Sequence, residues 1–153
     1  MDIKLIEQIA LLSGSVIALF TFIKAVFEYT RQNANKRVEL YLELRRQFKE
    51  NEKFRHICDL LDCEDPKIAE INFKDRRDFA AFFETIALMT NTGILREDIA
   101  HYMFGYSVIQ CWNCEYFWKG FNRGRYWSLL EYHVKRMEKK EKSFKFKRRN
   151  FRL

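Results

Sequence analysis

Apolar residues recur at helical spacing along most of this chain. No Gly or Pro interrupts residues 20–51, where Val38, Tyr41 and Phe48 repeat at that spacing, so the segment predicts one long helix. The same periodicity predicts four further helices, over residues 54–61, 75–90, 96–117 and 126–140. With five Gly and one Pro in 153 residues, tight-turned β architectures are disfavoured. The sequence therefore predicts an all-α fold.

Local signals place the ends of two of these helices. Asp75 precedes the apolar stripe of the third helix and is expected to be its N-cap. Gly93 follows Asn91 and Thr92 and can adopt the left-handed conformation that closes a helix at C′. A loop around residues 120–124 is expected to separate the last two helices.

The longest uncharged apolar run lies between Gln8 and Ile23. As a helix its 16 residues span about 24 Å, which is less than the roughly 30 Å of a bilayer's hydrocarbon core. Apolar flanks extend the run to Leu5 and Tyr29, because Lys24 lies near the helix end and its side chain can reach the lipid headgroups. We therefore expect one transmembrane helix, with a buried core helix as the alternative.

Basic residues predict the orientation of this helix. Arg31, Lys36 and Arg37 follow the apolar run closely, whereas only Lys4 precedes it. The positive-inside rule then puts the N-terminus outside and the body in the cytoplasm, a reducing compartment in which four cysteines stay free thiols. We expect three parts: a transmembrane anchor (1–30), a cytoplasmic bundle of about four helices (31–141) and a basic tail (142–153).

The net charge of +7 belongs to the C-terminal end of the chain. Residues 135–152 hold ten Lys or Arg against two Glu, a net of +8, which leaves −1 for the rest. The tail interleaves its cations with Phe144, Phe146 and Phe151. On a membrane-anchored protein this pattern favours contact with anionic lipid, although the same charges could hold RNA or DNA, or the tail could simply be solvated.

Small residues recur on one side of the expected anchor. Ala10, Gly14 and Ala18 stand at successive fourth positions, and such a stripe lets two membrane helices approach closely. We expect these three residues to form the interface of a homo-oligomer, while small residues are also common in membrane helices that do not associate.

The segment 116–127 is the densest chemical signal outside the anchor, with six aromatics, three cations and two glycines. Cations beside exposed rings suit phosphates and stacked bases, and glycines let backbone amides approach an anion. The candidate ligand-binding residues are Trp118, Lys119, Arg123, Arg125, Tyr126 and Trp127. The alternative is that the aromatic side chains close one end of the bundle while the cations face water.

Nothing in the sequence predicts catalysis or a cofactor. Cys111 and Cys114 have the spacing of a zinc or redox pair, but a second pair is missing and no βαβ pattern surrounds them. His101 and His133 lack an evident nucleophile or acid partner. We expect a protein that is not an enzyme and that binds no metal.

Several segments resemble a widespread type of small bacterial protein of unknown function. They are Gly14–Phe20 leading to Glu28-Tyr29, Arg37–Phe48, Asp78–Leu88, Phe104-Gly105-Tyr106 and Cys111-Trp112-Asn113. The layout of one membrane helix and a helical domain is also similar to prokaryotic antiphage membrane effectors. Some of those are accessory to type III CRISPR systems, sense cyclic oligoadenylate and damage the inner membrane.

These observations lead to one functional hypothesis and one alternative. The hypothesis is a sensor and effector of the bacterial inner membrane, active in antiphage defence, in which a linear or cyclic nucleotide bound by the bundle acts on an oligomeric membrane helix. The alternative is a non-enzymatic scaffold that recruits a protein partner to the membrane.

Overall fold

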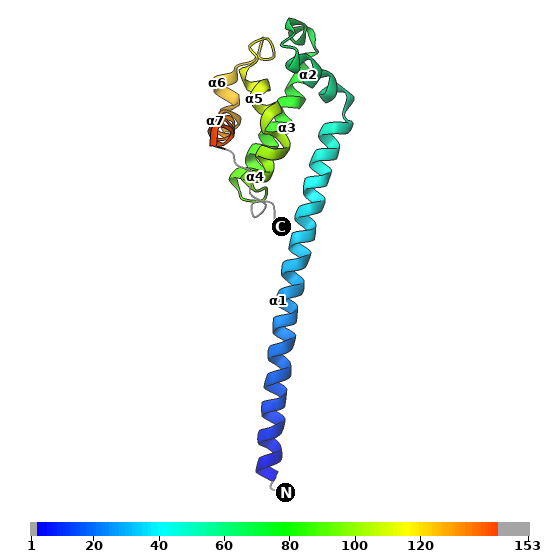
Figure 1. The fold of residues 1–153 in the computed structure, drawn as a ribbon, viewed down its shortest axis with the longest axis vertical. Coiled ribbons are helices and arrows are strands. Elements are labelled where there is room, and N and C mark those ends of the chain that lie inside the picture. The colour runs from blue at the N-terminus through cyan, green and yellow to red at the C-terminus, as the bar shows by residue number, and fades with distance from the viewer. Residues whose placement is uncertain (1–2, 144–153) are drawn as a thin grey trace. The chain divides into compact units, whose positions relative to one another are not determined.

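The computed structural model describes the backbone of residues 3–143 and the side chains of residues 17–143, and all regular structure in this part is helical, as predicted (Figure 1). The helices are α1 (Ile3–Glu50), α2 (Glu52–Asp62), α3 (Phe73–Asn91), α4 (Glu97–Ala100), α5 (Tyr106–Asn113), α6 (Arg123–Tyr126) and α7 (Ser128–Ser143). A 3-10 turn, η1 (Pro66–Glu70), and a π-helical turn, η2 (His101–Gly105), complete the order. The chain divides into two units, residues 1–39 and 40–153.

The described part of the first unit exposes large apolar side chains. They are Ile17, Leu19, Phe20, Phe22, Ile23, Val26, Phe27 and Tyr29. Within residues 17–143, no helix combines the length and the apolarity needed to cross a bilayer. That finding does not support the predicted transmembrane helix, whose run begins at Gln8, and the side chains of residues 1–16 lie outside the described part.

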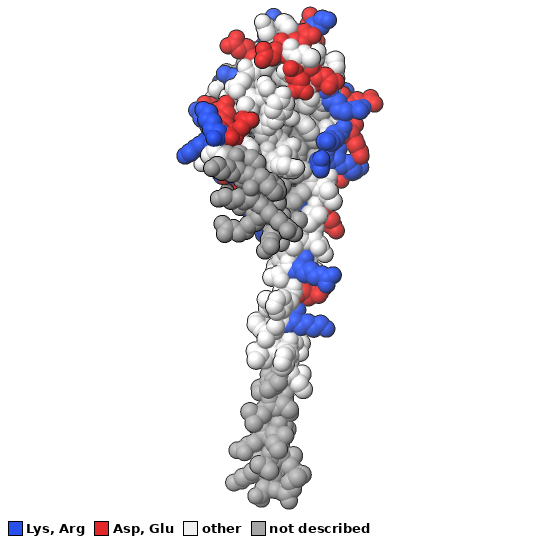
Figure 2. Space-filling view, viewed as in Figure 1, with Lys and Arg blue, Asp and Glu red and all other residues white. Residues whose placement is uncertain are grey.

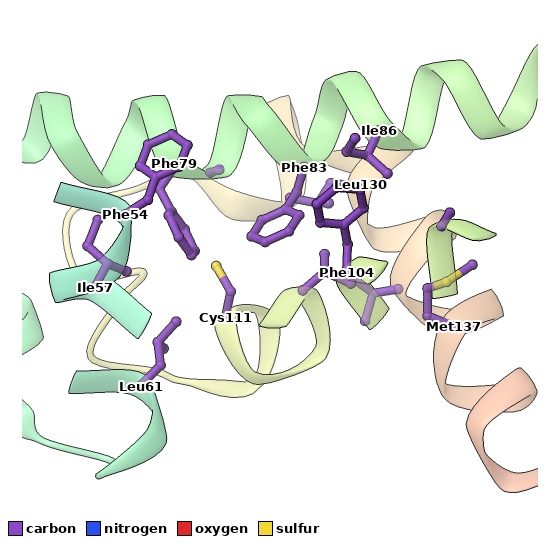
Figure 3. Packing of buried hydrophobic residues seen from close by; sticks show 14 of the residues in the cluster. Phe54, Ile57, Leu61, Phe79, Phe83, Ile86, Phe104, Cys111, Leu130 and Met137 are labelled. Atoms are coloured by element: carbon purple, nitrogen blue, oxygen red, sulfur yellow. The ribbon is translucent and has the colours of Figure 1, made fainter. Parts of the chain in front are cut away.

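The core of the second unit lies among α2, α3, α5, η2 and α7. In Figure 3, Phe79 lies beside Phe54 of α2, whereas Phe83 and Ile86 lie beside Leu130 of α7. Each large apolar side chain buried in this way contributes about 1.5–3 kcal/mol to folding. The amphipathic stripe that the sequence places on residues 79–90 is therefore the central face of the bundle.

The last turns of α1 belong to the same core. Tyr41 and Leu44 are buried, and the ring of Phe48 lies 5.4 to 6.1 Å from five other phenylalanine rings of the second unit. Edge-to-face and tilted pairs at such distances add to the free energy of burial. The bundle is thus built partly from the helix that also carries the exposed apolar segment.

The N-cap of α3 is Asn72, so the prediction of Asp75 was wrong. The Asn72 side chain accepts a hydrogen bond from the backbone N–H of Lys74 at 2.8 Å, the role that defines an N-cap. Asp75 lies in the first turn, where a negative charge is also favourable, and it pairs with Lys53 at 2.7 Å. At the other end, Gly93 has the predicted left-handed conformation, with φ of 76°.

The helix predicted over residues 96–117 is divided by the π-helical turn and ends early. A Cβ on Gly105 would lie 3.0 Å from Cδ2 of His101, so the absence of a side chain makes room for the imidazole ring inside the turn. The helix ends at Asn113, and the next residues fold back as a turn. Neither η1 nor the short helix α6 was predicted.

Candidate functional site

The turn after α5 folds its aromatic residues against one another. The rings of Trp112, Phe117, Phe121 and Trp127 lie 5.1 to 5.8 Å from that of Trp118. The indole N–H of Trp118 donates to the backbone carbonyl of residue 111 at 2.9 Å, so its polar atom is satisfied inside the cluster. These five rings, called the aromatic cluster below, close one end of the bundle.

Arg76 of α3 supports this turn from inside. Its side chain is only 5% exposed, and its guanidinium donates to the backbone carbonyls of Ile71, Phe117 and Lys119 at 3.2, 2.6 and 2.9 Å. The same group lies 5.3 Å from the centre of the Phe121 ring. Burial lowers the pKa of Arg76 without an acidic partner to offset it. The dipoles of these three carbonyls therefore stabilise the buried positive charge, a role that a carboxylate usually has.

Arg123 holds the cluster from the solvent side. Its guanidinium donates to the backbone carbonyl of Trp112 at 2.9 Å and lies 4.7 Å from the centre of the Trp112 ring. It also lies 5.8 Å from the Trp118 ring. This cation is engaged by the turn itself, through one hydrogen bond and two cation–π contacts.

The structure separates the six predicted ligand-binding residues into two groups. Trp118 and Trp127 are buried, at 6% and 8% exposure, and Arg123 is engaged by the aromatic cluster. Lys119, Arg125 and Tyr126 are exposed, with the Arg125 guanidinium 5.4 Å from the centre of the Tyr126 ring. The second group is the part that a soluble ligand can reach, and ligand binding there stays a prediction.

The predicted interface of small residues falls mostly on undescribed side chains. Ala10 and Gly14 lie outside the described part, and Ala18 is exposed on α1. Ala25, one heptad further on, is exposed as well. The structure contains one chain, so association through this stripe also stays a prediction.

Of the predicted cysteine pair, Cys111 of α5 is in the core, and Cys114 follows the end of α5 and is half-buried. Cys111 is buried and its pKa is raised, mainly by that burial and then by the neighbouring thiols of Cys114 and Cys58. A buried thiol with a raised pKa is a poor nucleophile and metal ligand, because the thiolate is the reactive form. Among the residues from 17 to 143, no group of His, Cys, Asp and Glu could hold a metal ion.

A groove that the sequence did not predict opens beside α2. It has a volume of about 760 Å³ and is lined by Phe48 and Lys49 of α1, by seven residues between 52 and 62 of α2, and by Tyr106, Ser107 and Gln110 of α5. Burial, then Asp62 and Asp59, raise the pKa of the lining thiol Cys58 to about 11. The lining residues of α5 are far in the sequence from those of α1 and α2, so no local pattern could have placed them together.

Comparison with known proteins gives a family and no described activity. No curated protein and no solved structure matches the chain. Nothing in the comparisons supports the resemblance to CRISPR-accessory membrane effectors. One family matches residues 8–146, which is most of the chain. The resemblance to small proteins of unknown function agrees with that match, and the chain belongs to the family described as a domain of unknown function (DUF4760).

Proposed function

We propose that this protein is a non-enzymatic, membrane-attached scaffold whose α1 enters the bilayer and whose bundle recruits a partner protein. The observation that carries the proposal is the exposure of large apolar side chains on most sides of α1 between residues 17 and 29. A helix that is apolar on nearly all sides is normally buried, either in a large core or in lipid. The exposure within the described part of the first unit argues for a surrounding apolar environment.

Two hydroxyl groups in and beside this segment are compatible with lipid as that environment, while its charged residues, Lys24 and Glu28, lie toward its C-terminal end. The hydroxyls of Thr21 and Thr30 donate to the backbone carbonyls of Ile17 and Phe27, both at 2.8 Å. In hydrocarbon every polar group must be satisfied within the protein, and these two are satisfied within their own helix. Ala18 and Ala25 lie together on the remaining side, where a second copy of α1 could pack closely.

Membrane fractionation of the full-length chain tests the proposal. The double variant F20D/F27D places two charges in the segment, and each costs about 2.5–3.5 kcal/mol at the centre of a membrane helix. We expect the native chain to float with liposomes and this variant to remain unbound. Leu42→Asp is the matched control, since Leu42 is also exposed on α1 but lies outside the segment. Equal flotation of all three proteins would overturn the proposal.

A nucleotide sensor for antiphage defence is the second candidate, favoured by the exposed group formed by Lys119, Arg125 and Tyr126. A cation beside an exposed ring suits a phosphate and a stacked base. Thermal-shift screening against linear and cyclic nucleotides tests it. A ligand at 100 times its Kd should add about 2.7 kcal/mol to the native state, and Arg125→Ala should abolish the shift. If no nucleotide shifts the melting temperature, this candidate is ruled out and the scaffold is the one proposed function that is left.

A further inference from the structure

The groove beside α2 has the size and surface of a binding site for a short peptide. Its volume of about 760 Å³ lies within the range of typical ligand sites. Phe48, Leu61 and Tyr106 give it apolar walls, while Asp59 and Asp62 stand on its rim. An occupant should therefore offer apolar side chains for the walls and cations for the rim.

The charge of the rim is negative. Arg55 lies 3.7 Å from Glu52, so these two charges largely offset each other, and the other lining bases are Lys49 and His56. Asp59 and Asp62 form no ion pair within residues 17–143, and both raise the pKa of Cys58.

The surroundings extend this negative field. Residues 50–70 hold seven acidic residues against three Lys or Arg. Figure 2 shows acidic side chains gathered at the end of the bundle that carries α2 and η1. A cationic segment is therefore attracted to the groove from a distance of about one Debye length.

The chain carries such a segment at its own C-terminus. Residues 144–153 contain five Lys or Arg, three Phe and no acidic residue. Alternating Phe and Lys over residues 144–147 would present rings and cations on opposite sides if the segment is extended. This composition matches apolar walls below an acidic rim.

The C-terminal segment is long enough to extend from the end of α7 to the groove. Ser143, the last residue of α7, lines a small hollow together with Glu97. Glu97 begins the helical run α4–η2–α5, and Tyr106 lies nine residues along it, which is about 14 Å or less at 1.5 Å per residue. Ten extended residues span up to about 33 Å.

From these observations we infer that residues 144–153 bind in cis in the groove formed by α2, α5 and the end of α1. The phenylalanines pack on Phe48, Leu61 and Tyr106, and the cations face Asp59 and Asp62. The segment then occupies the surface that a cationic partner protein would need. This inference does not depend on membrane attachment, because every residue in it belongs to the second unit.

Zero-length cross-linking of the full-length chain in detergent tests the inference. A water-soluble carbodiimide condenses a lysine amine with a carboxylate only where the two are in contact. We expect peptide mass spectrometry of the monomer fraction to find Lys147 joined to Asp59 or Asp62, because Lys145 is only two residues beyond the end of α7. Links found only in the dimer fraction, or spread evenly over the acidic residues of the surface, would overturn binding in cis.

Two variants and a matched control make the result specific. D59N/D62N changes two exposed residues. In this variant the C-terminal amides should exchange their hydrogens as fast as those of a free peptide. R148E/R149E keeps the reactive lysines and should lose the cross-links, without any change in the bundle. Glu115→Gln removes one exposed acid outside the groove and should behave as the native chain does. Unchanged protection in both double variants, together with unchanged cross-linking in R148E/R149E, would rule the inference out.

Discussion

Phe27 and Phe83 are the same residue type on two long helices, but Phe27 is 71% exposed whereas Phe83 is completely buried. On α3 the apolar residues follow one stripe, and α7, η2 and the end of α1 cover it. On α1 between residues 17 and 29 they surround most of the helix and are exposed within the described part of the first unit. The comparison teaches that hydrophobicity alone does not define a core, because its angular distribution decides whether one chain can bury it.

Replacing a buried and an exposed phenylalanine tests this comparison most directly. Phe83→Ala should lower the free energy of unfolding by about 3–5 kcal/mol, because it removes a large side chain and leaves a cavity. Phe27→Ala should change it by less than about 0.5 kcal/mol. Urea unfolding of the full-length chain, followed by circular dichroism, measures both. Similar losses in the two variants would break the distinction between the regions.

The pH dependence of the free energy of unfolding should reflect the burial of His133 in the second unit. Burial lowers the pKa of His133 to about 4 from 6.5. Since the unfolded chain binds this proton more readily, the contribution is fully present above pH 6.5 and is lost as the pH falls toward 4. The loss should approach about 3 kcal/mol, at 1.36 kcal/mol per pKa unit.

Unfolding measurements between pH 7 and pH 4 on two histidine variants identify the group responsible. His133→Leu should flatten the pH dependence, because it removes the buried titrating side chain. His56→Gln should leave the curve unchanged, since His56 is exposed. If the curve of His133→Leu matches that of the native chain, another group governs the acid sensitivity.

The buried arginine should matter more than its exposed neighbour. Arg76→Met leaves the carbonyls of Phe117 and Lys119 without their donor, at a cost of about 2 kcal/mol. Arg77→Met removes a half-exposed cation 3.8 Å from Asp78 and should cost less than about 0.5 kcal/mol.

Tryptophan fluorescence during urea unfolding can follow this difference. All three tryptophans of the chain belong to the aromatic cluster, so their emission reports on that end of the bundle. Arg76→Met should shift the emission to the red before global unfolding. Equal midpoints and spectra for the two variants would show that the turn does not depend on Arg76.

The smallest effect should come from two glycines in helical segments. Ala normally improves on Gly inside a helix by about 0.5–1 kcal/mol. At Gly124 a Cβ meets nothing within 4 Å, so Gly124→Ala should stabilise the chain by up to that amount. At Gly105 the new Cβ would press on His101, so Gly105→Ala should destabilise by about 1 kcal/mol. Thermal melts of the two variants measure these effects. A higher melting temperature for both variants would contradict the close packing of Gly105 against His101.

The sequence predicted what depends on local periodicity. The stripe from Phe79 to Thr90 predicted α3 and its buried face, and Gly93 predicted how that helix ends. The choice between Asn72 and Asp75 as N-cap failed because both residue types favour the first turn, and only the backbone geometry decides which one caps.

Contacts between residues that are far apart in the sequence could not be predicted from it. The sequence found the aromatic segment 116–127 and allowed that its rings close the bundle, but nothing local indicated that Arg76 would hold the turn from 41 and 43 residues away. The groove depends on α1, α2 and α5 meeting, which periodicity does not specify. The composition of segment 116–127 indicated a ligand site, but only the contacts in the structure distinguish its buried rings from its accessible ones.

The π-helical turn makes this fold tolerant of one particular change in chain length. Ile99 and Ala100 before the turn and Val108 and Cys111 after it all face the core. One residue of an α-helix corresponds to a rotation of about 100°. A π-turn holds one residue more than a regular α-helix needs over the same path, so a one-residue deletion within residues 101–105 would restore regular α-helix and keep Val108 and Cys111 in phase with Ile99. Conversion of the same residues to α-helix without a deletion would instead rotate Val108 and Cys111 by about 100° relative to Ile99. Natural relatives should therefore tolerate a gap of one residue here, and an alignment that places such a gap would mark a bundle with the same packing phase and a continuous helix.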